Sequence, residues 1–231
     1  MNPHQVTKDF EAALCGYTGA PYAVAVNSCT MALTLAVTWH FAKSRMLAGG
    51  LGQRSYESTY SPLGGTIRHH PSISIPKRTY VSVPMAIIHA GGRPVFRDED
   101  WLGCYQLQPL LVWDCARMLT SGMYLGKSGY RGHMQCVSFH ASKILGDTQG
   151  GAILHDNAEA DAWFRRARFD GRAEGVTPKD DKRIILGWHC YISPDVSARL
   201  LMKLTAVNFP RHNDPLPNDD YPDLSTLECF R

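Results

Sequence analysis

A lysine in an apolar setting is the first residue whose type and position suggest chemistry. Lys143 lies in a short polar link between two apolar segments, within CVSFHASKILGDTQGGAILH (residues 136–155). Because an ammonium is costly to bury, such a lysine either extends its charge to solvent or has a chemical task. A lysine made nucleophilic by burial and by its neighbours can form a Schiff base with an aldehyde. The link alone leaves both interpretations open.

Polar residues also follow two other apolar segments. Ser28, Cys29 and Thr30 come directly after YAVAV and open a predicted helix. Free backbone N–H groups, the helix dipole and two hydroxyls suit a phosphate there, although a plain N-cap by Asn27 or Ser28 explains the same residues. Asp114 ends PLLVWD, where an acid could be a structural cap or a ligand. No neighbouring histidine or carboxylate spacing supports a metal, so no metal site is predicted.

Apolar runs alternate with helical periodicity along the chain, and this alternation predicts the elements that hold these residues. It predicts an α/β fold of three layers, with a mostly parallel sheet flanked by helices. Ligands of such sheets bind at the carboxyl ends of the strands, where Ser28, Asp114 and the 138–143 link all fall. The predicted strands are 22–26, 72–76, 93–100, 109–114, 135–139 and 150–156, and the predicted helices lie near 10–14, from 28 onward, and at 81–92, 157–169 and 195–207.

Length and composition limit the classes of protein. The 231 residues are enough for one domain, predicted at 1–207 with a loop insertion at 48–72, followed by an extended or weakly ordered tail at 208–231. The chain has no apolar run long enough to span a membrane and begins without a signal-peptide pattern, so we expect a cytoplasmic protein. Seven cysteines without a CxxC pair favour reduced thiols. A net charge of +3 is too small to indicate a polyanionic partner.

Three motifs, in chain order, resemble those of one family. Pyridoxal phosphate requires a phosphate cup, an acid that keeps its pyridinium nitrogen protonated, and a lysine. YAVAVNSCTMALTLAV, VWDCAR and SFHASK resemble the segments that meet these needs in the DegT/DnrJ/EryC1/StrS family of pyridoxal-phosphate-dependent sugar aminotransferases, which has the aspartate aminotransferase fold (type I). The resemblance implies that Lys143 forms the Schiff base and that Asp114 is the pyridinium partner. It assigns the phosphate to Ser28, Cys29, Thr30 and Ser138, with Cys29 in place of a family glycine.

The resemblance extends to four further residues. In PKRTYVSVPMAIIHAGGRPVFRD, the resemblance implies that Tyr80 stacks on the cofactor ring. In VWDCAR, it implies that Arg117 lies near the phenolic oxygen of the cofactor. His140, beside the lysine, could assist proton transfer or simply pack. His189, in GWHCYISPDVSA, stands where the family has an asparagine that reaches the phosphate of the neighbouring subunit. The family therefore also implies a homodimer.

The chain departs from the family at two places. Between Asp98 and Asp114, where the family has a further strand and helix, only EDWLGCYQLQPLLVW remains. The C-terminal small domain is expected to be largely absent. The fold expected is thus a shortened large domain of the type I transferase.

The leading hypothesis is transfer of an amino group through Lys143, with an amine or amino acid as substrate. A decarboxylase or lyase acting on an amino-acid-modified nucleotide or DNA base, of the kind used in phage DNA modification, is an alternative because the cofactor supports those reactions. The loop 48–72 would then bind nucleic acid, although a solvated loop explains it as well. Its basic and aromatic residues are Arg54, Tyr56, Tyr60, Arg68, His69 and His70. A non-catalytic relative that serves as a binding module is the third hypothesis.

Overall fold

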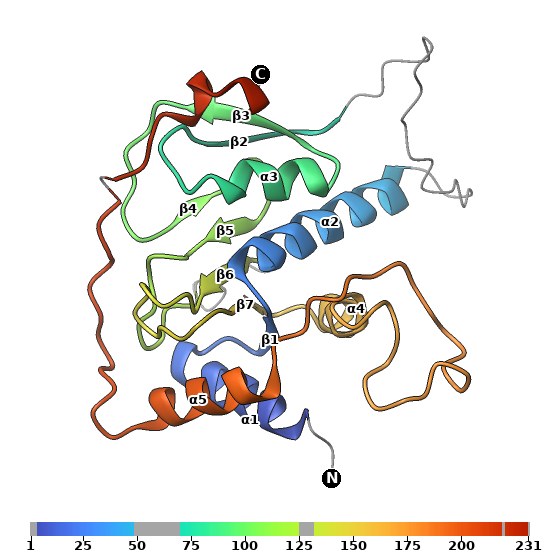
Figure 1. Ribbon diagram of the computed structural model, residues 1–231. Helices are drawn as coiled ribbons and strands as arrows, with labels where there is room; N and C mark the ends of the chain where they lie inside the picture. The colour runs from blue at the N-terminus through green and yellow to red at the C-terminus, as the bar shows by residue number, and fades with distance from the viewer. Residues whose placement is uncertain (1–3, 49–69, 125–131, 219, 231) are drawn as a thin grey trace.

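The computed structural model describes residues 4–48, 70–124, 132–218 and 220–230 (Figure 1). Residues 49–69 of the predicted loop, with Arg54, Arg68 and His69 among them, lie outside the described residues. The structure therefore does not test whether this loop binds nucleic acid or is simply solvated.

Five strands form the central sheet, in the order β1 (Tyr22–Val26), β7 (Gly151–His155), β6 (Met134–Ser138), β5 (Val112–Asp114) and β4 (Tyr105–Gln106). The pair β5–β6 is parallel, whereas β1–β7, β6–β7 and β4–β5 are antiparallel. The predicted α/β class is confirmed, but the sheet is mixed and not mostly parallel. Neither the β6–β7 link nor the β4–β5 link contains a helix, so the chain turns back at both and pairs antiparallel.

A second, two-stranded sheet adjoins the first. Its strands β2 (Ser72–Pro76) and β3 (Arg93–Arg97) are parallel and are joined through α3 (Ser82–His89). An antiparallel bridge between Ser74 and Gln108 connects β2 to the chain just after β4. The predicted strand, helix and strand of this region are therefore present, and they place the segment after β2 beside the carboxyl end of β5.

Helices cover the central sheet on both faces, as predicted (Figure 1). Val24 and Val26 of β1 pack into one core with α2 (Cys29–Ala48) and α4 (Ala158–Ala167). The intervening Ala23 and Ala25 pack into a second core, against the helices α1 (Gln5–Thr18) and α5 (Pro194–Thr205). Alternate residues of one strand thus face opposite cores, which is the pattern of a sheet buried between two helical layers.

The C-terminal tail runs along the outside of the molecule from α5 to the edge near β3 (Figure 1). It ends in two short 3-10 helices, Leu224–Thr226 and Glu228–Phe230. It is also anchored, because Leu224 is fully buried and its amide donates to the carbonyl oxygen of Lys77 at 2.9 Å. Its order therefore comes from contacts with residues more than 100 positions earlier in the chain.

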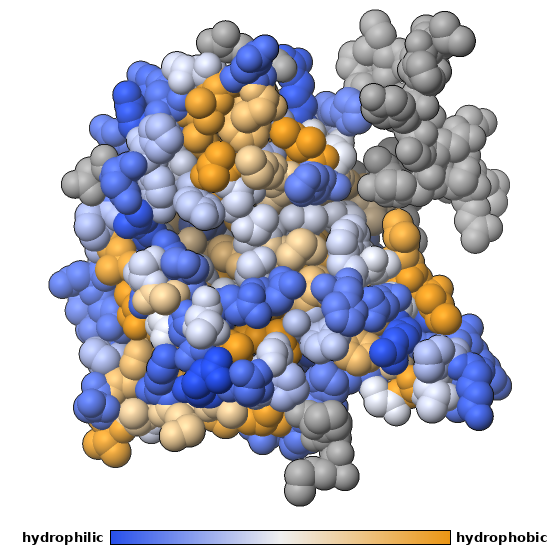
Figure 2. Space-filling model, in the orientation of Figure 1, coloured by the Kyte–Doolittle hydropathy of each residue, from blue (hydrophilic) through white to orange (hydrophobic). Residues whose placement is uncertain are grey.

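Hydrophilic residues cover most of the face shown in Figure 2, and apolar residues gather there over α3 and β3. Across the described ranges, no helix combines the length and the apolar character needed to cross a bilayer. All seven cysteines are free thiols, as the sequence predicts.

Candidate active site

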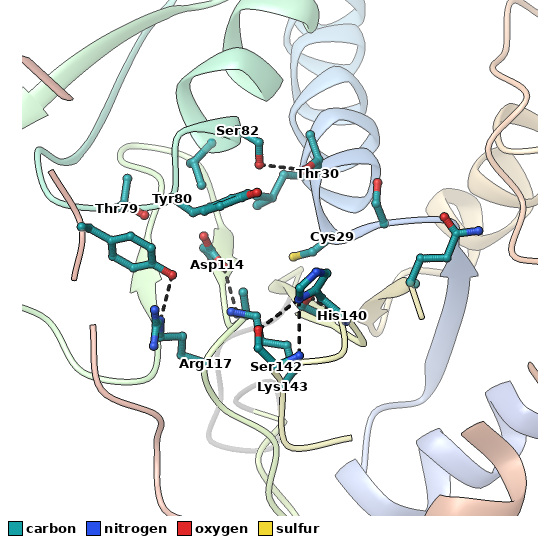
Figure 3. A pocket seen from close by; sticks show the side chains of 18 of the residues that line it. Cys29, Thr30, Thr79, Tyr80, Ser82, Asp114, Arg117, His140, Ser142 and Lys143 are labelled. Carbon is teal, nitrogen blue, oxygen red and sulfur yellow. Dashed lines mark hydrogen bonds between the residues drawn. The ribbon is translucent and has the colours of Figure 1, made fainter. Parts of the chain in front are cut away.

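A cavity of about 320 Å³ lies where β1, β5 and β6 end (Figure 3). Since β1 and β6 both run antiparallel to β7, while β5 is parallel to β6, all three strands end at the same edge. The cavity brings together nine of the ten residues that the sequence singles out, namely Ser28, Cys29, Thr30, Tyr80, Asp114, Arg117, Ser138, His140 and Lys143.

The link between β6 and β7 holds Lys143 in a tight turn. The Lys143 amide donates to the carbonyl oxygen of His140 at 2.8 Å. A Cβ atom at Gly146 would lie 2.5 Å from the carbonyl oxygen of Ala141, so only glycine allows this turn to close. The turn places the half-buried Lys143 side chain at the cavity.

Asp147 fixes this link to the outer helix α5. Its carboxylate accepts from Arg199 Nη2 at 2.9 Å and from Lys203 Nζ at 2.8 Å. Hydrogen bonds from Arg199 and Lys203 hold the pKa of the Asp147 carboxyl well below its usual value. The carboxylate is therefore charged at neutral pH, and the position of the lysine turn depends on α5.

Asp114 is a buried carboxylate with neutral hydrogen-bond donors. Its Oδ1 accepts from the Ala116 amide at 2.9 Å, and its Oδ2 accepts from the Tyr105 hydroxyl at 2.9 Å. Because the only proton of that hydroxyl points to Asp114, the Thr79 hydroxyl, 2.6 Å away, donates to the Tyr105 oxygen. Burial raises the pKa of Asp114 above its usual value. A carboxylate in this state gains stability from any cation that enters the cavity beside it.

The start of α2 supplies hydroxyl and amide groups to the cavity. Ser28 Oγ accepts from the Met31 amide at 3.2 Å, so Ser28 is an N-cap, as the simpler of the two sequence interpretations holds. Thr30 Oγ lies 2.7 Å from Ser82 Oγ at the start of α3. Two helices thus begin beside the same cavity, and both present hydroxyls to it (Figure 3).

β7 approaches the start of α2 very closely. A Cβ atom at Gly151 would lie 2.5 Å from the Cys29 amide nitrogen, so a side chain there would push β7 away from the turn. Cys29, which replaces a family glycine, adds a thiol to the cavity wall. Burial and then Asp114 raise the pKa of this thiol well above its usual value, so Cys29 stays uncharged.

The remaining predicted residues differ in where they lie. His140 is exposed at the cavity, and its Nδ1 lies 3.0 Å from Ser142 Oγ. Ser138 Oγ accepts from the His140 amide at 3.4 Å. His189 does not line the cavity. Its Nδ1 lies 3.1 Å from Asp170 Oδ2, and both side chains are exposed. Its contact with a neighbouring subunit stays a prediction.

Several lining residues had no assigned role in the sequence analysis. Thr79 and Ser82 flank Tyr80 in the motif that pointed to that ring, and their hydroxyls were the available signal. Tyr105 lies between Asp98 and Asp114, where the sequence was expected to depart from the family, and the two tail residues Asp220 and Tyr221 lie far along the chain. The polar and aromatic residues that line or support the cavity without a predicted role are Thr79, Ser82, Trp101, Tyr105, Ser142, Gln149, Asp220 and Tyr221.

Lys143 is expected to react as a neutral amine at lower pH than an ordinary lysine. Burial, and then the nearby charge of Arg117, lower the pKa of Lys143, while Asp114 partly opposes them. Competitive acylation followed by peptide mass spectrometry should give a midpoint for Lys143 below the usual value of about 10.4. Arg117→Gln should move that midpoint upward, since it removes a cation. Arg211→Gln, at an exposed position, is the matched control, and equal midpoints in the two variants would contradict the assignment.

The described residues contain no group of three or more histidine, cysteine, aspartate or glutamate side chains that could hold a metal ion. The polar groups around the cavity are instead hydroxyls, amides, the buried Asp114 carboxylate, the Asp220 carboxylate, the Lys143 amine, the Arg117 guanidinium, the His140 ring and the Cys29 thiol. This donor set suits an organic anion that also carries a cationic ring.

A sequence profile of the DegT/DnrJ/EryC1/StrS aminotransferase family matches residues 3–45 and 104–209. The chain belongs to this family. The matched ranges carry Ser28, Asp114 and Lys143, whereas Tyr80 lies in the unmatched stretch between them. The assignment of Tyr80 to the site is therefore supported by its position in the cavity wall and not by the family match.

Solved structures of DegT-family and other aminotransferases share the fold. A pyridoxal-phosphate-dependent aminotransferase from Bacillus cereus superposes with a TM-score of 0.57 at 17% identity, over 87% of this chain and 59% of that one. Helicobacter pylori PseC, an aminotransferase of pseudoaminic acid biosynthesis, gives 0.58 at 17% identity, over 87% and 57%. Bacillus subtilis NtdA, solved with bound pyridoxamine phosphate (PMP), gives 0.57 at 17% identity, over 86% and 47%. This chain therefore spans less than two-thirds of the length of each of these structures.

Proposed function

We propose that this chain is a pyridoxal-phosphate-dependent enzyme that transfers an amino group from an amine or amino acid. The observation that carries the proposal is that Lys143, Asp114 and the start of α2 line one cavity. Family membership makes amino transfer the first expectation among the reactions of this cofactor.

The residues present fit pyridoxal phosphate by their chemistry. Asp114 is buried with only neutral donors and faces the cavity, which suits the pyridinium nitrogen. Ser28, Thr30 and the first amides of α2 suit the phosphate. Within the described chain, the Lys143 ammonium makes no hydrogen bond, so its amine is available to an aldehyde. Tyr80, whose side chain is 57% exposed, offers a ring face at the same cavity.

Each residue then has a definite task. When bound, pyridoxal phosphate supplies an aldehyde that condenses with an amine and a ring that accepts an electron pair from the substrate's α carbon. Lys143 holds the cofactor and, once released, moves the proton at that carbon, a task that its lowered pKa favours. Asp114 holds the proton on the ring nitrogen, and Tyr105 keeps the Asp114 carboxylate in place.

The alternative functions differ from amino transfer in the reaction, if any, that follows binding of the cofactor at Lys143. A decarboxylase or lyase would use the same cavity but release a different product, and a binding module would keep the cavity without turnover. The retention of lysine, acid and helix start together favours an enzyme. Pyridoxamine phosphate, measured after mixing the loaded protein with single amino acids, separates amino transfer from the other two.

Covalent labelling tests the proposal directly. The protein is mixed with pyridoxal phosphate, reduced with borohydride and digested, and the pyridoxyl group is located by mass spectrometry. We expect the label on the peptide that contains Lys143, and none there in Lys143→Ala. Lys182→Ala, which removes an exposed lysine, should label as the unaltered protein does. Equal labelling of many lysines, with Lys143 unlabelled, would refute the proposal.

The finer expectations about partners are also part of this proposal. A homodimer follows from the family, and sedimentation at micromolar concentration would show either twice the chain mass or a monomer. Action on DNA would require binding by the 48–72 loop, whose affinity should then fall steeply with salt. Salt-insensitive or absent binding would remove that alternative.

A further inference from the structure

Each of the three guanidinium nitrogens of Arg117 donates a hydrogen bond to the C-terminal tail. Nε donates to the Tyr221 hydroxyl at 2.8 Å, Nη2 donates to Asp220 Oδ1 at 3.0 Å, and Nη1 donates to the carbonyl oxygen of Pro217. The guanidinium also lies 4.6 Å from the centre of the Tyr221 ring. A planar five-donor group matched by three acceptors holds its partners in one geometry.

Anchors on both sides of this contact hold the tail. Before it, the Leu216 amide donates to the carbonyl oxygen of Arg117 at 2.9 Å. After it, Asp223 lies 3.3 Å from Lys77 Nζ, and Leu224 is fully buried. Asp220 and Tyr221, which lie between these anchors, are therefore held against the cavity from both sides.

The anchored segment contributes to the cavity wall. Asp220 and Tyr221 line the cavity together with Trp101 and Tyr80. The Tyr221 ring is stacked with Trp101 at a centroid distance of 6.3 Å and an interplanar angle of 13°, and it lies 6.3 Å from Tyr80. Three aromatic rings from separate parts of the chain thus form one side of the cavity.

We propose that Tyr221 is a ligand-contacting residue of the site and that Arg117 is the positioning residue that holds it there. Arg117 would then act through the tail, in place of the direct cofactor contact that its motif suggests. The inference rests on the proposed function, since the ligand is the pyridoxal phosphate that the cavity fits.

Tail docking and ligand binding are then coupled. If the docked tail supplies part of the contact, the ligand must stabilise docking by the same factor by which docking raises ligand affinity. One aromatic contact of this kind corresponds to about a 3- to 10-fold change in affinity.

The test uses pyridoxal phosphate and two measurements on the full chain. Equilibrium dialysis gives its dissociation constant, and hydrogen exchange reports on the Leu216 and Leu224 amides that dock the tail. Leu224→Asp breaks an anchor outside the cavity, and Val207→Asp is the matched control because Val207 is fully exposed. Tyr221→Ala removes the ring, while Tyr221→Phe keeps it.

We expect pyridoxal phosphate to slow exchange at both amides in the unaltered protein. Leu224→Asp and Tyr221→Ala should bind it about 3- to 10-fold more weakly. Tyr221→Phe keeps the ring but loses the hydrogen bond from Arg117, so it should lose less affinity than Tyr221→Ala, and Val207→Asp should bind as tightly as the unaltered protein. Arg117→Ala should speed exchange at Leu216, and Arg117→Lys should restore it only in part.

Two results overturn the inference in different ways. If Tyr221→Ala and Leu224→Asp bind as tightly as Val207→Asp, the tail has only a structural role and the proposed function stands. If the unaltered protein neither binds pyridoxal phosphate nor labels at Lys143, the proposed function fails, and the inference fails with it.

Discussion

Asp114→Asn should lower the rate of amino transfer by about 100- to 1,000-fold, the effect of removing one preorganised electrostatic partner of the reacting group. The amide keeps the size of the side chain and one acceptor, but it cannot hold a proton on a pyridinium nitrogen. Steady-state rates with saturating pyridoxal phosphate measure the loss.

Stability should move differently from activity in this variant. Burial raises the pKa of Asp114, so the fold disfavours its charged form, and the stability of the empty protein falls as pH rises from the unfolded pKa through the higher folded pKa. Asp114→Asn removes that penalty, and its melting temperature near pH 7 should equal or exceed that of the unaltered protein. Asp214→Asn, at an exposed residue, should leave both activity and melting unchanged. An active Asp114→Asn enzyme would contradict the assigned role.

Arg168→Met should destabilise the fold by about 3–5 kcal/mol, the usual effect of breaking a buried ion pair from one side. Arg168 is 1% exposed, and its guanidinium bonds to Glu11 of α1 and donates to the carbonyl oxygen of Ala25 in β1 at 2.7 Å. Chemical denaturation monitored by circular dichroism measures the change. The substitution removes the Arg168 donor from the Ala25 carbonyl oxygen, and it leaves Glu11 with the Ala25 amide and Arg165 as hydrogen-bond partners.

An exposed ion pair gives the control. Lys43→Met removes the partner of Glu159 on the surface, and the loss should stay below about 1 kcal/mol. Equal losses in the two variants would show that Arg168 is no more than a surface charge.

The buried pair should also make stability sensitive to acid. Burial alone would raise the pKa of Glu11, but Arg168 and Arg165 hold that pKa below its usual value. That stabilisation is present above the unfolded pKa and is lost as pH falls through the folded one.

Local patterns predicted the elements well, and long-range contacts explain the errors. The strands at 22–26 and 72–76 follow from residues that are neighbours in sequence. Strand direction depends on what joins the strands, and the β6–β7 link has no helix to carry the chain back, so the predicted parallel pairing is wrong there.

The contrast between local patterns and long-range contacts also applies to the residues of the site. Residues that end neighbouring strands could be grouped from sequence, because the carboxyl ends of parallel strands meet at one edge. Asp114 and Lys143 were found in this way. Tyr221 is 104 residues from Arg117, its hydrogen-bond partner, and no spacing in the sequence links the two. Tyr105 was missed because no motif in the sequence links it to Asp114, which lies nine residues later and accepts its hydrogen bond.

The Asp147 contacts join α5 to the turn that carries Lys143. Arg199 and Lys203 lie 52 and 56 residues beyond Asp147, on a helix whose other side packs against α1. The turn that carries Lys143 therefore takes its position from the outermost layer of the protein, and under the proposed function sequence changes in that layer are subject to the demands of the reaction as well as to those of folding.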